Sequence, residues 1–137
     1  MKSLALLVLS LVAAGSVSAQ DACKHRGELD TPFCDEDGDL LADPPKDPKL
    51  LKDPDTIFFT NSPLDDVGAF KKLMLPFVEH LEKCTAKKVR YYDVFSSAAA
   101  IEAMRSGRMH LGMFSTGDTA FAVNLAGAIP FAIRGDA

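Results

Sequence analysis

Residues 96–121, SSAAAIEAMRSGRMHLGMFSTGDTAF, constrain the fold more than any other stretch of the chain. Apolar residues recur at helical spacing between Ala98 and Met104, and Ser106-Gly107 then supplies a helix stop signal. The run at residues 109–114 is short and mostly apolar, as expected of a parallel strand that is covered on both faces. The stretch therefore predicts a helix, a tight turn, a buried strand and a loop that opens a second helix.

The same alternation of short apolar runs and helical patterns extends through the C-terminal part of the chain. Four runs have the composition of strands, and helical patterns separate them: residues 56–60, 89–95, 109–114 and 129–133. The order β-α-β-α-β-α-β predicts an α/β fold, in which right-handed crossovers join the strands of a mainly parallel sheet. Helices are expected to flank this sheet.

An apolar helical stripe follows the first predicted strand and extends from Val67 to Leu81. Asp65-Asp66 form a natural opening for it, because carboxylates stabilise a helix N-terminus. Pro76 interrupts the stripe, so the choice is between one kinked helix and two consecutive helices. Since proline is well tolerated in a first helical turn, we expect one helix to end near Leu73 and a second to start there.

Hydroxyl and amide side chains follow each of the first three predicted strands. They are Thr60, Asn61, Ser62, Ser96, Ser97, Ser115, Thr116 and Thr119. In an open α/β sheet, ligands bind in the crevice beyond the carboxyl ends of the strands. These groups also lie near predicted helix starts, where backbone N–H groups and the helix dipole attract phosphate-like anions. Each one alone is equally consistent with ordinary helix capping, but together they predict a binding edge for an oxyanion.

Asp118 is the exception in this set of neutral groups. A carboxylate in the first turn stabilises the helix that starts near Ser115, but it repels an anion held at the same helix end. Two interpretations stay open. Asp118 either points away as a cap, or it favours a ligand that carries an amino group.

The chain starts with the pattern of a secretory signal peptide over residues 1–19. Lys2 is the positive flank, residues 4–12 form the apolar run, and residues 17–19 are a small-residue cleavage site. The run is short for a transmembrane span, although a retained anchor is the structural alternative. We expect cleavage after Ala19 and a soluble exported protein.

Residues 20–55 predict an extended, acidic, proline-rich arm. Eleven acidic residues face only five Lys or Arg between positions 21 and 55, whereas the rest of the chain is close to neutral. Apolar periodicity is almost absent from the arm. In an exported protein, Cys23 and Cys34 are placed to form a disulfide that closes this polar segment. Cys84 remains as a small, half-buried residue near the end of a predicted helix.

Acidic residues alternate within the arm at Asp35, Asp37, Asp39 and Asp43. Alternating carboxylates can turn several oxygens toward one hard cation, so calcium is a candidate ligand. The pattern departs from the standard calcium loop, since its glycine is at the fourth position and no glutamate closes it. The alternative is a solvated acidic turn.

No catalytic constellation is found in the sequence, so we do not expect an enzyme. His25, His80 and His110 lack metal-ligand spacing and are more typical of solvated or core histidines. The nucleophile-elbow, phosphate-binding lysine loop and paired-cysteine motifs are all missing. A concentrated basic face is also missing, which argues against a nucleic acid partner, and apart from calcium no cofactor is expected.

Several of these segments together resemble the phosphate/phosphite/phosphonate-binding proteins of bacterial ABC importers. The resemblance covers roughly residues 53–135. It is carried by the signal sequence, the strand followed by Asn61-Ser62-Pro63, the helix PFVEHLE at 76–82, and above all IEAMRSGR at 101–108 running into a Phe-Ser-Thr-Gly loop. It implies a periplasmic, two-lobed binding protein that closes over a small oxyanion and delivers it to a membrane permease.

The chain departs from that family pattern in two ways. Many members open the second helix with Asp-Tyr, where this chain has Ser96-Ser97. The family's second lobe has no counterpart, so the resemblance implies a truncated member whose remaining lobe binds ligand weakly or not at all. Two further hypotheses stay open: a calcium-dependent extracellular interaction module, and a ligand-sensing domain with the same fold.

Overall fold

The computed structural model describes residues 23–61, 67–133 and 135. The predicted signal peptide, Ser62 and the helix opening at Asp65-Asp66 lie outside the described residues. The elements are a 3-10 helix and seven strands or helices: η2 (Pro48–Leu50), β1 (Thr56–Asn61), α1 (Val67–Leu73), α2 (Leu75–Thr85), β2 (Lys88–Tyr91), α3 (Ser97–Arg105), β3 (Leu111–Met113) and α4 (Thr116–Ala126). Within these described segments, every helix is too short or too polar to cross a lipid bilayer.

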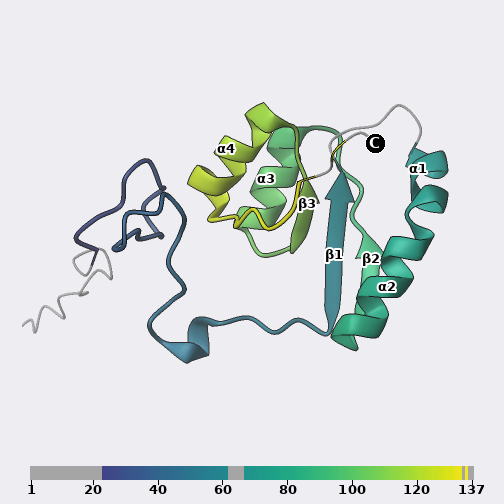
Figure 1. Cartoon of the computed structure of the whole chain (residues 1–137), viewed down its shortest axis with the longest axis horizontal. Helices are drawn as coiled ribbons and strands as arrows, with labels where there is room; N and C mark the ends of the chain where they lie inside the picture. The colour runs from purple at the N-terminus through teal and green to yellow at the C-terminus, as the bar shows by residue number, and fades with distance from the viewer. Residues whose placement is uncertain (1–22, 62–66, 134, 136–137) are drawn as a thin grey trace, which may run out of the picture.

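The three strands form one parallel sheet in the order β2-β1-β3, as Figure 1 shows. Phe59 at the centre is level with Tyr91 on one side and Leu111 on the other, and Asn61 is level with Met113. All three strands therefore end at the same edge of the sheet. The predicted α/β class with a parallel sheet is confirmed.

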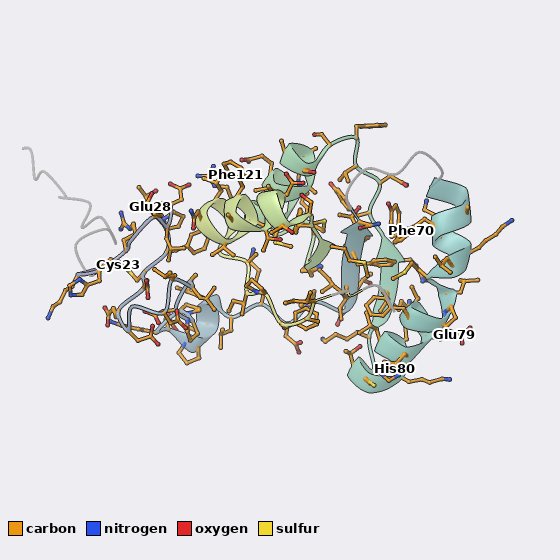
Figure 2. The ribbon with its side chains drawn as sticks, turned by 45° about the horizontal axis from the view of Figure 1, so that its top comes forward. Cys23, Glu28, Phe70, Glu79, His80 and Phe121 are labelled. Atoms are coloured by element: carbon orange, nitrogen blue, oxygen red, sulfur yellow. A yellow bond between two sulfur atoms is a disulfide. The ribbon has the colours of Figure 1, made fainter. Side chains whose placement is uncertain are left out.

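Helices α1 and α2 cover one face of the sheet (Figure 1). Phe59, Phe70 and Val89 form the buried centre of this layer, and Phe70 points from α1 toward the strands in Figure 2. The helical stripe is divided as predicted, because α1 ends at Leu73 and α2 carries Pro76 in its first turn. There the missing N–H of proline has no intrahelical partner to lose.

Helix α3 covers the opposite face and packs in turn against α4. Ala100, Ala103 and Met109 are the buried residues of this layer. Small alanine side chains allow the backbone of α3 to approach its neighbours closely. Phe58, one position before Phe59 in β1, points to this face and stacks edge-on against Tyr92. The alternation of Phe58 and Phe59 thus connects the two layers through one strand.

The predicted fourth strand at residues 129–133 is wrong. Gly127 ends α4 in a left-handed conformation with φ 62°, and no strand follows it within the described residues. Ile129, Phe131 and Ile133 are 57%, 75% and 98% exposed. Pro130 has no N–H to donate to a ladder, and β3 offers only three residues to pair with. The apolar segment therefore has no neighbouring strand long enough to pair with.

The N-terminal arm has a core contact that its composition does not predict. Leu29 and Ala42 bury their side chains against Val123 of α4, and the arm lies beyond α4 in Figure 1. The backbone N–H of Asp30 donates to the carbonyl of Asn124 at 2.8 Å. A disulfide joins Cys23 to Cys34 within the arm. The expectation of a merely extended segment is therefore corrected for residues 23–43.

Candidate functional site at the carboxyl edge of the sheet

The predicted ligand residues converge because the parallel strands end at one edge. Thr60 and Asn61 end β1, Ser96 precedes α3, and Ser115 precedes α4. The chain passes from β1 to β2 on one side and then returns from β2, past β1, to β3 on the other side. This reversal makes the β1–β3 boundary the switch point where α/β sheets bind ligands. The position of Ser62 is not among those described.

The two residues at the end of β1 differ in what their side chains do. The Thr60 side chain is fully buried, and its hydroxyl donates to the carbonyl of Tyr92 at 2.7 Å. It holds the segment after β2 against β1. Asn61 as a whole residue is 9% exposed, and its side-chain amide has no hydrogen-bond partner among the described residues. Asn61 is thus the better placed of the two to receive a ligand.

Two of the predicted hydroxyls cap helices. Ser96 is the N-cap of α3, and its Oγ accepts from the N–H of Ala99 at 3.1 Å. Ser115 is the N-cap of α4, and its Oγ accepts from the N–H of Asp118 at 3.3 Å. The Thr119 hydroxyl turns back and donates to the carbonyl of Ser115 at 2.8 Å. Capping accounts for these contacts without any ligand.

Asp118 connects the beginnings of α3 and α4. Its Oδ2 accepts from the hydroxyl of Ser97 and from the hydroxyl of Ser115, each at 2.8 Å. The carboxylate therefore lies among the groups that were expected to hold an oxyanion. Sequence reasoning identified Asp118 as an anomaly but missed its contact with Ser97, which depends on the packing of two helices.

Backbone donors remain at the start of α4. Of its first N–H groups, Asp118 donates to Oγ of Ser115 and Thr119 donates to the Ser115 carbonyl at 2.9 Å. The N–H groups of Thr116 and Gly117 have no acceptor among the described residues. Both residues are exposed, and a Cβ added to Gly117 would meet nothing within 4 Å. A small acceptor can therefore approach these two donors.

The acidic loop of the arm is a separate cluster. Oxygens of Asp35, Asp37 and Asp39 lie within 4.8 Å of one another. The Asp35 carboxylate is 4% exposed and accepts the N–H groups of Gly38, Asp39 and Leu40 at 2.8 to 3.2 Å. Asp43 instead accepts the N–H of Glu36 at 2.8 Å and is not part of this group. These hydrogen bonds alone can account for the shape of the loop.

The three histidines are dispersed and do not join a metal cluster within the described part of the chain. His110 has a structural role, since its Nδ1 accepts the N–H of Phe58 at 3.0 Å. Burial, and to a smaller extent the charge of Lys52, lower the pKa of His110. His80 contacts the exposed Cys84 on α2, with Nε2 and Sγ 3.5 Å apart.

Comparisons with known proteins identify the C-terminal part of the chain. A family model described as "ABC transporter, phosphonate, periplasmic substrate-binding protein" matches residues 59–137. This range is more than half of the chain and begins inside β1, so it includes the strand ends, α3 and α4. Neither the curated proteins nor the solved structures gave a match.

Proposed function

Because this chain belongs to the family of periplasmic substrate-binding proteins of phosphonate ABC transporters, we propose that the carboxyl edge of its sheet binds a phosphonate, phosphite, phosphate or a related oxyanion. The family match carries this proposal, since it covers the strand ends and the helix starts that follow two of them. The function is one of binding and delivery to a membrane permease in the periplasm, with no chemical step.

Asn61, Thr116 and Gly117 provide the hydrogen-bond donors of the proposed site. The Asn61 amide can donate from the end of β1, and the two backbone N–H groups can donate from the start of α4. A helix N-terminus adds a partial positive charge without a fixed cation, which suits an anion that must also leave. Ser96, Ser97, Ser115, Thr119 and Thr60 are proposed to shape this edge, mainly through the contacts that they make within the protein.

Titration of the full chain with phosphate, phosphite and 2-aminoethylphosphonate tests the proposal. Nuclear magnetic resonance is the suitable readout, because chemical-shift changes register weak binding as well as tight binding. Shifts should concentrate at Asn61 and at residues 115–119. Asn61→Ala should weaken binding by about tenfold, as expected for one lost hydrogen bond to a charged group.

Ser106→Ala is the matched control for this experiment. The Ser106 hydroxyl ends α3 at the opposite edge of the sheet and donates to the carbonyl of Glu102 at 2.8 Å. Its removal should leave every affinity unchanged. Absence of binding by all three ligands, or equal effects of the two substitutions, would contradict the proposed site.

A second candidate function is calcium-dependent interaction through the arm, and the convergence of Asp35, Asp37 and Asp39 is the observation that favours it. If a cation is held there, calcium should raise the melting temperature and Asp37→Asn should abolish the rise. Glu28→Gln, which removes an acid of the same arm outside the cluster, should not. Equal melting temperatures with calcium and with a chelator would eliminate this function.

A further inference from the structure

Cys84 is the cysteine that no disulfide holds, since Cys23 is bonded to Cys34. It lies in the last turn of α2, four residues after His80. Both residues are exposed. Helix α2 lies at the opposite end of the molecule from the arm in Figure 1, and Figure 2 shows His80 on this helix. The pair is therefore open to a ligand from solvent and is separate from the acidic loop.

The spacing of His80 and Cys84 places them on one face of α2. Residues four apart are neighbours on a helix surface, and the same spacing lets the two histidines of an H-E-x-x-H helix bind one zinc ion. Val78 and Leu81 of the same helix pack inward against the layer around Phe59. The exposed pair thus faces away from the sheet.

The distance between the two ligand atoms matches one edge of a tetrahedral zinc site. Nε2 of His80 and Sγ of Cys84 are 3.5 Å apart. Zinc with the usual bond lengths to an imidazole nitrogen and a thiolate, at a tetrahedral angle, separates these atoms by about 3.5 to 3.6 Å. A cation that replaces the thiol proton therefore needs little rearrangement of either side chain. Nitrogen and sulfur are also the ligand atoms that zinc prefers.

The two ligands of one chain are half of a structural zinc site. Such sites are almost always four-coordinate, and two cysteines with two histidines are a usual ligand set. No third His, Cys or acidic side chain of the described residues lies close enough to join the pair. A second copy of the chain, related by a two-fold axis through the metal, supplies the same two ligands again.

The charges beside the pair also suit a second copy. Glu79 and Lys83 are exposed, and each directly precedes one of the two ligands. They lie on the same flank of α2 and carry opposite charges. When two copies of α2 lie antiparallel across the metal, Glu79 of one copy comes near Lys83 of the other, so opposite charges meet.

We propose that His80 and Cys84 form half of a tetrahedral zinc site, which a second copy of the chain completes. Zinc takes the imidazole in its neutral form and the sulfur as a thiolate, and the thiol proton passes to solvent. The inference is independent of the proposed function, because α2 ends just before β2 starts. The pair therefore lies toward the amino edge of the sheet, opposite the proposed oxyanion site.

The test adds zinc to the full chain and measures its mass by size-exclusion chromatography with light scattering. The mass should double when one zinc ion is present for two chains, and the chelator EDTA should reverse the change. Cobalt(II) is the spectroscopic probe, because it accepts the same tetrahedral ligands and gives a charge-transfer absorption when a thiolate binds it. The disulfide-bonded cysteines of the arm cannot produce this absorption.

His80→Ala and Cys84→Ser should each abolish the zinc-dependent dimer. Cys84→His should restore the dimer without the cobalt–thiolate absorption, because two histidines at this spacing also bind zinc. His25→Ala is the matched control, since His25 is an exposed histidine of the arm, and this variant should dimerise as the wild-type chain does. All four substitutions are at exposed positions, and circular dichroism establishes that each variant is folded.

Three results would overturn the inference. A dimer that resists EDTA but disappears with a reductant would be a disulfide between two copies of Cys84. A chain that binds zinc and stays monomeric would refute the shared site. A zinc-dependent dimer that persists in His80→Ala would place the metal on other residues, such as the acidic loop of the arm.

Discussion

The carboxylate of Asp30 in the arm is ion-paired with the guanidinium of Arg105 in the last turn of α3. Their side chains are 23% and 41% exposed, so water screens the pair only in part. The contact lies beside the hydrogen bond from the N–H of Asp30 to the carbonyl of Asn124. Together the ion pair and the hydrogen bond hold the arm against α3 and α4.

Asp30→Asn should lower the free energy of unfolding by about 0.2 to 1 kcal/mol, the usual range for a partly solvated pair. Asparagine keeps the acceptor oxygen that receives the N–H of Thr31 at 2.7 Å, so the change is confined to charge. Urea denaturation measures it, and combination with Arg105→Gln should be less than additive. Full additivity would show that the pair contributes nothing.

Gly127→Ala should destabilise the chain for two reasons. Gly127 has φ 62°, and an added Cβ would lie 2.6 Å from the ring of Phe33. We expect a loss of about 1–2 kcal/mol from the backbone alone, and more from the displaced ring. Gly38→Ala separates the backbone strain from the clash with Phe33, since Gly38 has φ 76° but its Cβ would meet nothing within 4 Å. Equal losses in the two variants would mean that the Phe33 contact is unimportant.

His110 should make stability depend on pH. Its pKa in the folded chain is below the unfolded value, so the unfolded state binds the proton more readily. The stabilising contribution is complete above the unfolded pKa, at about 6.5, and is lost as the pH falls through the lower folded pKa. Protonation also removes the Nδ1 lone pair that accepts from Phe58.

His110→Gln checks this dependence, because a glutamine oxygen can still accept a backbone hydrogen bond but does not titrate. Urea denaturation of both proteins between pH 5 and 8 is the measurement. The wild-type chain should lose more stability than the variant on the acid side. Parallel pH curves would disprove the role of His110.

Phe59→Ala should cost about 3–5 kcal/mol, as for other buried phenylalanines. Phe59 is 2% exposed and lies at the centre of the sheet between β2 and β3. Phe95→Ala is the control, because Phe95 is 97% exposed and its loss should be close to zero. Chemical denaturation compares them directly. A large loss of stability at Phe95 would contradict the exposed position of that ring.

The sequence predicted the elements whose signals are local. The helix-turn-strand pattern of residues 96–121 and the break between α1 and α2 at Pro76 are both present. Caps, proline and glycine act over a few neighbouring residues, so they can be recognised without knowledge of the tertiary fold. The capping role that was the alternative for each predicted ligand hydroxyl is the one that Ser96 has in α3.

The features that could not be predicted depend on contacts between distant segments. The apolar run at residues 129–133 looked like a strand, but a strand requires a partner, and pairing cannot be read from composition. The arm lacks periodicity, yet Leu29 and Ala42 are buried because α4 offers Val123. The bond from Ser97 to Asp118 likewise exists only because α3 and α4 lie side by side.

The packing of the arm on α4 also has a consequence for the sequence of steps in folding. The contact between Leu29 and Val123 closes a loop that contains the whole sheet, and closing so long a loop is entropically unfavourable until other contacts have formed. The Cys23–Cys34 loop is short and can close before any strand has paired. A compact N-terminal loop is therefore expected to form early, and its capture by α4 should be among the last steps, slow because its contacts are so distant in sequence.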